Sequence, residues 1–315
     1  MPTVVTLGEA MVVFTAEEYI PLEYATSFKK GLGGAEANFA IGVRRLGFDV
    51  GWISRVGKDP FGNFIIKNLK SEGVDVSGVK IDEDHPTGIY FKEKRNSIIT
   101  NVYYYRKGSA ASFMVPEDLD EGYIASAKIL HITGITPALS DTCRATVYKA
   151  IEIAKSHNIT ISFDPNIRLK LWKDNEYKKV LLDIAQYADI VLPGLEEGKM
   201  LFGITEPESI AKKFLDMGAK IVALKLGDKG AMLVTQEQTI YQSSSKVKEV
   251  DPVGAGDGFD AGFIVGLLRG WELKECLRLA NDVGAIVVST KGDMEGLPTM
   301  EEVEIFRGNM VHIER

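Results

Sequence analysis

Six short apolar runs, separated by segments of helical period, constrain the fold more than any other feature of this sequence. They are VVTLG (4–8), VGWISRVG (50–57), ILHITGI (129–135), ITISFDP (159–165), DIVLPG (189–194) and KIVALKLG (220–227). Near-continuous hydrophobic runs of this length are typical of strands buried on both faces. Between them lie helical patterns such as TVYKAIEIAKSHN (146–158), whose apolar positions 147, 150, 151 and 154 share one face. The alternation predicts a mostly parallel sheet with helices on both sides, and ligands beyond the carboxyl ends of its strands.

Two stretches, residues 11–28 and 87–106, break this rhythm. Both mix polar and apolar residues, and no helix separates TGIYFKEK from IITNVYYYR; the intervening RNS (95–97) predicts a hairpin connection. We expect a small antiparallel sheet whose apolar face needs a partner, either as a lid over a cleft or by pairing with another subunit. Since there is no repeat, low-complexity tract or linker, residues 1–315 are predicted to form one domain, with a lid formed by about 11–28 and 87–106.

Composition excludes several classes of function. No apolar run approaches the ~20 residues of a membrane span, and the start, MPTVVTLGEAMVVF, lacks the features of a secretory signal. A cytoplasmic location is therefore expected. The formal net charge of −7 argues against nucleic acid and anionic membranes as partners. It also means that an anionic substrate would need specific arginines to create a local positive site.

Cysteine and histidine usage gives no sign of a disulfide or a metal centre. Cys143 and Cys276 lie far apart in helix-like surroundings, so we expect buried free thiols. The four histidines lack ligand spacing and are expected to be surface or packed imidazoles; they are His85, His131, His157 and His312.

The stretch GAGDGFDAGF (254–263) places an acid directly behind three small residues at the start of a helix. Apolar residues recur at helical spacing from Gly254 to near Gly270, so the small residues open that helix. Its free N–H groups and dipole form an anion site, and Asp257 in the first turn can supply a base. The alternative is a simple turn whose aspartate only satisfies the helix dipole, and the local pattern weighs both equally. The stretch is not a Walker A loop, because the Gly-Lys-Ser/Thr ending is absent.

Four motifs together resemble the ribokinase-like (PfkB) carbohydrate kinases. They are GLGGAEANFAIGVRRLG (31–47), DPNIR (164–168), KLGDKG (225–230) and DPVGAGDGFDAGF (251–263), in the family's order and across nearly the whole chain. The resemblance implies a three-layer α/β/α sandwich with a small antiparallel β-sheet lid, and ATP-dependent phosphorylation of a sugar. It implies that Asp257 is the general base. It also implies that the backbone amides of Gly254, Ala255 and Gly256 stabilise the negative charge on the transferred phosphoryl group.

The substrate side is expected around Gly33, Gly34 and Asn38, which match the family's sugar-binding signature. Small residues bring the backbone near sugar hydroxyls, and Asn38 offers both a donor and an acceptor. Glu9 and Glu36 are further candidates for this pocket. A plain strand–helix turn explains the same residues on local evidence alone.

The lid segment NVYYYRKGSAASF (101–113) suggests which sugar. On a strand, Tyr104 and Arg106 share one face, and Tyr90 on the preceding strand flanks them. The pattern YxR, together with Arg168 of DPNIR, resembles 2-keto-3-deoxygluconate kinases, in which a ring covers the carbon skeleton and guanidinium groups hold a carboxylate. A neutral hexose would leave Arg106 desolvated and unpaired, so a sugar acid is expected.

Alternatives to this function stay open at the level of sequence. An exposed aromatic strand with a rim arginine explains the lid segment equally well, and a fructokinase or another PfkB-type sugar kinase is the competing enzyme. A non-catalytic sugar-binding regulator is the alternative from another class, which the retained Asp257 disfavours. A homo-oligomer formed through the lid sheet is expected.

The nucleotide side follows from the resemblance. It implies that ATP lies near residues of DPNIR, of KLGDKG, of the opening of the 254–270 helix, and of RLANDVGAIVV; these are Asn166, Lys225, Gly227, Gly230, Gly254, Gly256 and Asn281. A bulged turn and a surface amide are the local alternatives for KLGDKG and Asn281. Mg²⁺ is expected to accompany ATP with few protein ligands. The family's Asn-x-x-Glu element has Gly194 in place of Asn, so Glu197 is the predicted metal contact, through water.

Overall fold

The computed structural model describes residues 1–95 and 100–310. Part of the expected 95–97 hairpin connection and His312 lie outside the described residues. Within them, the main sheet has nine strands in the order β13-β12-β11-β10-β9-β8-β1-β4-β5. Their bounds are β1 (Val4–Leu7), β4 (Val50–Gly57), β5 (Val79–Asp82), β8 (Ile129–Thr133), β9 (Thr160–Asp164), β10 (Ile190–Val191), β11 (Ile221–Lys225), β12 (Ala231–Val234) and β13 (Thr239–Gln242).

All six apolar runs form strands of this sheet, as expected. The neighbouring strands from β5 to β11 run parallel, whereas β12 and β13 are antiparallel additions at one edge. The parallel strands therefore place their carboxyl ends on one edge of the sheet, where ligands bind in open α/β sheets.

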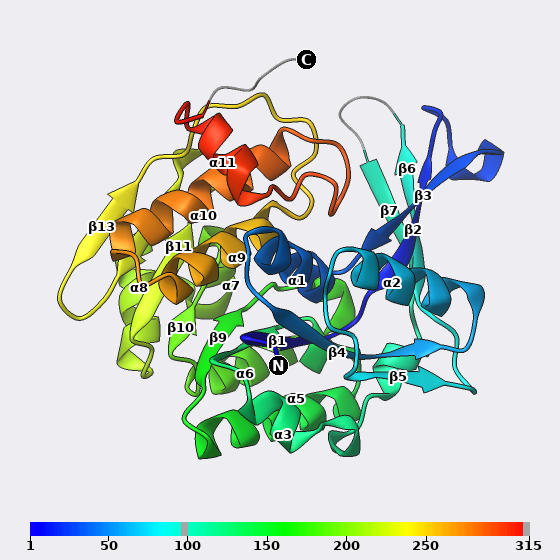
Figure 1. The fold of residues 1–315 in the computed structure, drawn as a ribbon, viewed down its shortest axis with the longest axis horizontal. Helices are drawn as coiled ribbons and strands as arrows, with labels where there is room; N and C mark the ends of the chain where they lie inside the picture. Colours follow the sequence, from blue (N-terminus) through cyan, green and yellow to red (C-terminus); the bar gives the residue numbers. More distant parts are fainter. Residues whose placement is uncertain (96–99, 311–315) are drawn as a thin grey trace.

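Helices cover both faces of the sheet in three layers (Figure 1). Alternate strand residues divide between two hydrophobic cores: Val4 belongs to one and Val5 to the other. The first core contains residues of α1 (Ala35–Arg45), α2 (Pro60–Ser71), α9 (Ala255–Leu268), α10 (Leu273–Val288) and α11 (Met300–Phe306). The second contains residues of α3 (Glu121–Ala125), α5 (Asp141–Ser156), α6 (Glu176–Ala185), α7 (Leu195–Phe202) and α8 (Pro207–Asp216). Among the described helices, none is both long enough and apolar enough to cross a membrane.

A smaller sheet stands beside this body, at the upper right of Figure 1. Its four described strands are β2 (Met11–Ala16), β3 (Phe28–Gly33), β6 (Ile89–Lys94) and β7 (Thr100–Tyr105), in the order β3-β2-β6-β7. The expected antiparallel arrangement holds for β2–β3 and β6–β7 but is wrong for the central pair, because β2 and β6 run parallel. Both strands enter from the carboxyl edge of the main sheet, β2 after β1 and β6 after β5, and so they point the same way. We call this sheet the lid.

The lid's bounds also differ from the expected ranges. Residues 17–27 connect two strands and contain only a short 3₁₀ turn (Leu22–Tyr24), while β3 continues past residue 28 to Gly33. The lid face that holds Val13 and Tyr90 is turned toward the body, as a hydrogen bond from Tyr90 to Asp293 shows. The opposite face carries a cluster of aromatic rings, of which Phe14 packs on Phe61 of α2.

Candidate active site

Helix α9 begins at the carboxyl edge of the main sheet with the small residues of the GAGD stretch. Gly254 is its N-cap and has φ +80°, a left-handed conformation that favours glycine. A Cβ at Gly254 would lie 2.5 Å from the carbonyl oxygen of Asp293, so this position also lacks space for a side chain. The first-turn N–H groups of a helix have no intrahelical acceptors, and the helix dipole adds positive potential there. The helix start is therefore suited to bind an anion.

Asp257 occupies the first turn of α9 and is 9% exposed. Its Oδ2 accepts a hydrogen bond of 2.9 Å from Asn38 Nδ2. Burial raises the pKa of Asp257 to about 7, against the lowering effects of the Asn38 hydrogen bond and of Lys225 and Arg168. A carboxylate with a pKa close to the working pH is well matched to proton abstraction.

A buried cation lies beside this helix start. Lys225, at the end of β11, pairs with Asp164 of β9 at 3.1 Å and with Asp260 of α9 at 2.9 Å. Burial alone would lower the pKa of Lys225, but these carboxylates raise it above its ordinary value. Its Nζ lies 3.7 Å from where a Cβ of Gly256 would stand. The ammonium is thus fixed next to the helix N-terminus, where it adds to the positive potential.

The pKa values of the two carboxyl groups that contact Lys225 are shifted in opposite directions. Burial would raise the pKa of Asp164, yet Lys225 holds it below the usual range. Burial raises the pKa of Asp260 well above the ordinary value, and the charge of Asp164 adds to this effect. The pKa shifts of the two carboxyl groups thus point in opposite directions, and Asp164 is the stronger acid of the two.

The two glycines of the GLGG stretch mark a close approach between lid and body. A Cβ at Gly33 would overlap the hydroxyl of Tyr90 and come within 2.8 Å of Asp293 Oδ2. Gly34 has φ +142°, and a Cβ there would lie 2.6 Å from the backbone oxygen of Glu9. Asn38, which the sequence places with the sugar, contacts the predicted base directly, and its buried Oδ1 has no partner among the described residues.

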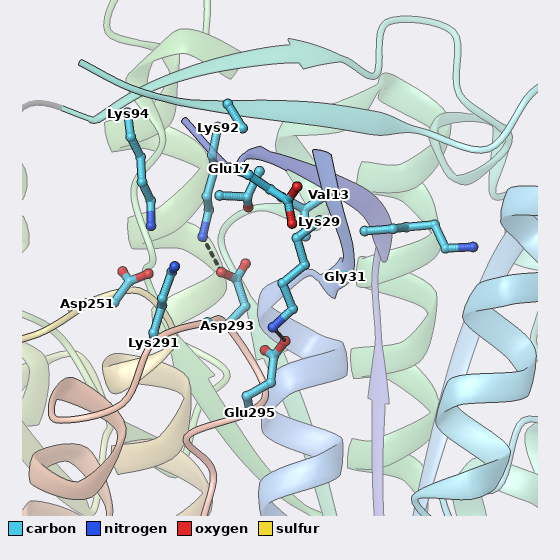
Figure 2. Close-up of a pocket in the computed structure, with 14 residues that line it drawn as sticks. Val13, Glu17, Lys29, Gly31, Lys92, Lys94, Asp251, Lys291, Asp293 and Glu295 are labelled. Carbon is cyan, nitrogen blue, oxygen red and sulfur yellow. Dashed lines mark hydrogen bonds and ion pairs between the residues drawn. The ribbon is translucent and has the colours of Figure 1, made fainter. Parts of the chain in front are cut away.

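Asp293 is a site residue that the sequence did not reveal. It accepts a hydrogen bond of 2.5 Å from Tyr90 Oη of β6. It also forms an ion pair with Lys92 of the same strand (Figure 2). Burial and the nearby charge of Asp293 raise the pKa of Tyr90 above its ordinary value. Asp293 therefore connects the lid to the start of α9. The only sequence signal was a carboxylate between glycines after the last long helix, which is typical of an ordinary turn.

A cavity of about 240 Å³ lies on the far side of this contact. Its walls carry five lysines and four carboxylates from the lid, from the 291–295 loop and from Asp251. Lys29 pairs with Glu295 at 3.6 Å, and Lys94 and Lys291 lie near Asp251 (Figure 2). Charges of both signs line the cavity, so it does not favour an anion strongly.

Arg106 is already paired with a carboxylate of the protein, which the sequence did not lead us to expect. Its Nε donates to Glu9 Oε2 at 2.7 Å, and its Nη2 forms an ion pair with the same oxygen. The expectation that a neutral sugar would leave Arg106 unpaired is therefore wrong, because Glu9 already compensates its charge. Tyr104 lies beside it, with the guanidinium 5.7 Å from the ring centre, and the Tyr104 and Tyr90 rings are 5.4 Å apart. Arg168 is exposed beyond the end of β9.

The second candidate carboxylate, Glu36, is fully buried under the site. Its Oε1 accepts hydrogen bonds from Thr133 at 2.5 Å and Thr136 at 2.8 Å, while Oε2 has no hydrogen-bond partner in the part of the chain that the structure describes. Burial raises its pKa. Glu36 accepts hydrogen bonds from the end of β8 and from the helix that follows. Its carboxylate therefore holds α1 against the main sheet rather than facing a sugar.

The residues predicted to bind the nucleotide have the following surroundings. Gly227 and Gly230 both have positive φ, and the loop at Gly227 is open to solvent. Asn281 is buried and donates to Gln242 O at 3.0 Å, so the surface-amide alternative is wrong. Asn166 has φ +36° and is buried, with its N–H 3.1 Å from Asp164 Oδ1.

A polar cavity of about 510 Å³ opens beside Asn281. It is lined by the 242–245 segment and by α10 and α11 residues that include Arg278, Asp282 and Phe306. Asn281 lies one helical turn from Gly284, and a Cβ at Gly284 would be 3.5 Å from the backbone oxygen of Ala255. The cavity therefore lies within a few helical turns of the anion site at the start of α9.

The described residues contain no cluster of three or more metal-binding side chains. Glu197 uses both carboxylate oxygens to accept backbone N–H groups, from Ile167 at 2.7 Å and from Gly194 at 2.7 Å. Burial, and then the charge of Asp164, raise its pKa. Glu197 thus fits a water-mediated contact better than direct coordination, and Mg²⁺ would have to be held mainly by phosphate oxygens and water.

The structure brings most of the predicted residues into two adjoining groups. One group lies between the lid and the body and consists of Tyr104, Tyr90, Gly33, Gly34, Asn38 and Asp257. The second group begins at the start of α9, where Lys225 lies beside Gly256 and binds Asp164, and Asp164 accepts from the N–H of Asn166. Gly230 and Asn281 both contact the 242–244 segment. Asp257 contacts Asn38 of the first group, and Lys225 and Gly256 of the second group lie beside the same helix start. A carboxylate next to a helix N-terminus and a buried ammonium is suited to the transfer of an anionic group.

Comparison with known proteins agrees with this geometry. The model of the pfkB family of carbohydrate kinases matches residues 1–300. A 2-dehydro-3-deoxygluconokinase of Bacillus subtilis (strain 168) is 44% identical over 96% of this chain and 94% of its own length, and one of Thermoproteus tenax is 38% identical with the same coverage. A solved E. coli structure, described as a candidate ribokinase II with ATP and Mg²⁺, superimposes with a TM-score of 0.92 at 31% identity, covering 98% of this chain and 100% of that one. From the matched length and the fold, the chain belongs to the pfkB family of carbohydrate kinases.

Proposed function

We propose that the protein transfers the γ-phosphoryl group of ATP to the terminal hydroxyl of 2-keto-3-deoxygluconate, giving the 6-phosphate. The observation that carries the proposal is a buried Asp257, with its pKa raised to about 7, in the first turn of a helix whose N-terminus is suited to bind an anion. The names of the B. subtilis and T. tenax relatives support the substrate. The ATP and Mg²⁺ of the E. coli structure support the phosphoryl donor and its metal ion.

In this mechanism Asp257 removes the proton of the substrate hydroxyl as its oxygen attacks the γ-phosphorus. The new O–P bond forms while the bond to the bridging oxygen of ADP breaks, and the proton stays on Asp257 until solvent removes it. The backbone N–H groups of Gly254, Ala255 and Gly256 stabilise the charge on the transferred group. Lys225 adds a fixed positive charge on the same side. Mg²⁺, when bound with ATP, supplies further charge neutralisation.

Recognition of the sugar acid is assigned to the body-facing side of the lid and to Arg168, which follows β9 of the main sheet. Arg106 and Arg168 supply cations for the carboxylate, and Tyr104 and Tyr90 cover the carbon skeleton. Gly33 and Gly34 bring the backbone close to the hydroxyl groups. The proposal covers both the gluconate and the galactonate epimers.

An ADP-release assay tests the function, with 2-keto-3-deoxygluconate, fructose and ribose compared side by side. We expect kcat/KM for the sugar acid to exceed the values for both neutral sugars. A clear preference for fructose would reject the sugar acid but keep the kinase. No turnover with any of the three would favour the sugar-binding regulator.

We further propose a homodimer formed through the lid face opposite Val13 and Tyr90. We also propose a cytoplasmic location, where ATP is available. Tyr103 and Tyr105 are 42% and 63% exposed on this face, next to the aromatic cluster of Phe14 and Phe91. Exposed aromatic clusters of this kind are common at interfaces. Sedimentation velocity should give the dimer mass, and Tyr105→Glu should shift it toward 34.6 kDa. A monomer at all concentrations would reject this interface.

A further inference from the structure

Glu9 occupies the junction between the body and the lid. It lies between β1 and β2 and is 1% exposed. Four described segments connect the two parts of the molecule, and each contacts Glu9 or contains it. A Cβ at Gly34 would lie 2.6 Å from its backbone oxygen, a Cβ at Gly88 would lie 2.6 Å from Oε1, and Ser109 donates to Oε1 at 2.5 Å. Its carboxylate is therefore held from all sides of the junction.

The two oxygens of Glu9 have different partners. Oε1 accepts from Ser109, whereas Oε2 binds the Nε and Nη2 side of Arg106. Within the described part of the chain, Arg106 Nη1 donates no hydrogen bond to the protein, although the Arg106 side chain is only 10% exposed. A guanidinium has five N–H donors in a fixed plane, so one edge on Glu9 leaves another edge available to a ligand.

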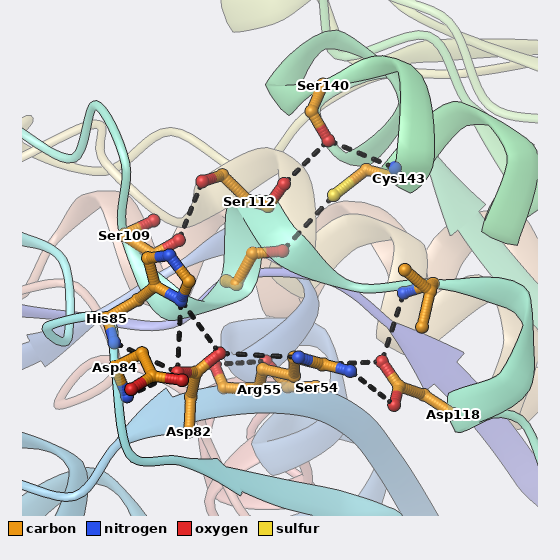
Figure 3. Close-up of polar contacts among 12 residues, drawn as sticks. Ser54, Arg55, Asp82, Asp84, His85, Ser109, Ser112, Asp118, Ser140 and Cys143 are labelled. Atoms are coloured by element: carbon orange, nitrogen blue, oxygen red, sulfur yellow. Dashed lines mark hydrogen bonds and ion pairs between the residues drawn. The ribbon is translucent and has the colours of Figure 1, made fainter.

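The segment that carries Ser109 is itself anchored to the body (Figure 3). Ser112 Oγ donates to Ser109 O at 2.6 Å, and Ser140 Oγ donates to Ser112 O at 2.6 Å. Cys143 Sγ contacts Ala111 O at 3.1 Å. Ser140 and Cys143 belong to the start of α5. The Ser109–Ser112 segment, which holds Glu9 Oε1, is therefore fixed to the body independently of the lid.

The segment that leads into β6 is anchored in the same region (Figure 3). His85 Nδ1 contacts Asp82, which also pairs with Arg55, and Arg55 binds both oxygens of Asp118 at 2.6 and 2.9 Å. The His85 ring stacks on Phe113 at 3.5 Å. Both connections of the β6–β7 hairpin are thus fixed, and the orientation of Arg106 depends on Glu9.

We propose that Glu9 is a positioning residue that aims the free edge of Arg106 at the carboxylate of a sugar-acid substrate. The inference rests on the proposed role of Arg106 and goes beyond it, because it assigns the specificity for an acid to a pair rather than to one arginine. A second possibility is that Glu9 only neutralises Arg106. In that case its negative charge would repel the substrate, and removing it would strengthen binding.

Glu9→Gln separates these possibilities because glutamine keeps the shape and removes the charge. We expect KM for 2-keto-3-deoxygluconate to rise at least about tenfold, the effect of losing one charged hydrogen bond. KM for ATP and kcat should stay within about twofold. A lower KM for the sugar acid would overturn the proposal. An equal loss in kcat and in KM for ATP would also overturn it, since it would show a merely structural role.

A double-mutant cycle tests whether Glu9 acts through Arg106. In the Arg106→Ala background, Glu9→Gln should cause no further rise in KM for the sugar acid. Additive effects would overturn the positioning role. Arg106→Ala with an unchanged KM for the sugar acid would instead reject the proposed function of Arg106, so the two failures can be told apart.

Two further variants complete the experiment. Glu18→Gln removes an exposed charge from the connection between β2 and β3 and should leave all constants unchanged. Ser109→Ala removes the hydrogen bond to Oε1 but keeps the charge of Glu9, so KM for the sugar acid should rise about threefold. If Glu9→Gln fails to fold, Ser109→Ala decides: an unchanged KM for the sugar acid would overturn the proposal.

Discussion

Asp257→Asn tests the central chemical assignment, because asparagine keeps the shape of the protonated side chain but cannot accept the proton. Loss of the general base should lower kcat by at least ~10²-fold. Asn38 can rotate its amide so that its unpartnered Oδ1 accepts from the new amide, and the site should therefore stay intact. KM for ATP and for the sugar should change by less than about threefold.

The same substitution should stabilise the fold in a pH-dependent way. The pKa of Asp257 is raised to about 7 in the folded protein, against an ordinary value of 3.8. The folded state therefore holds the proton more tightly than the unfolded state, and the wild type loses stability as pH rises from about 4 to about 7. At 1.36 kcal/mol for each pH unit, the difference of about three units gives up to about 4 kcal/mol above pH 7.

Urea unfolding of the wild type and of Asp257→Asn, at pH 5 and at pH 8, measures this effect. At pH 5 the raised pKa destabilises the wild type by only about 1–2 kcal/mol. The difference in the free energy of unfolding between the variant and the wild type should therefore be larger at pH 8 than at pH 5, by about 3 kcal/mol. kcat/KM of the wild type should rise with pH to a plateau, with its inflection near 7. An advantage that is equal at both pH values would refute the raised pKa, and unchanged kcat in the variant would refute the role as base.

Two further substitutions test the surroundings of Asp257. Arg106→Ala should raise KM for the sugar acid by about 10- to 100-fold and change KM for fructose much less; equal losses with both sugars would contradict a carboxylate contact. Lys225→Met leaves buried Asp164 without its cation, so urea unfolding should show a loss of about 3 kcal/mol or more. It should also move the kcat/KM inflection to higher pH, because Lys225 lowers the pKa of Asp257. Lys220→Met, whose side chain is 77% exposed, is the matched control and should stay within about 0.5 kcal/mol of the wild type.

The sequence predicted the layered body well because that prediction depends on local patterns. Strands buried on both faces need continuous apolar runs, and the run at 50–57 became β4 with the same bounds. The α9 helix was predicted from Gly254 to near Gly270 and runs from Ala255 to Leu268. Small residues before Asp257 served as a reliable start signal, since only a glycine fits the left-handed N-cap at this crowded point.

The contacts across the junction could not be predicted in the same way. Glu9 and Arg106 are 97 residues apart, and Asp293 is 203 residues from Tyr90. No local period relates such pairs; only the folded topology brings them together. The parallel pairing of β2 with β6 was missed for a similar reason, because strand direction depends on where each strand enters the lid.

The charges around Asp257 support the proposal that the helix start, rather than a row of cations, binds the phosphates. A base with a pKa near 7 needs burial and few nearby positive charges, whereas a transferred phosphoryl group needs positive potential. Cations placed directly around the site would serve the phosphates but would lower the pKa of Asp257 and weaken it as a base. Lys225, a buried cation beside α9, is largely offset by Asp164, whose charge raises the pKa of Asp257. Backbone N–H groups carry no net charge and point at the anion, so they stabilise the transferred group at a smaller cost to the basicity of Asp257.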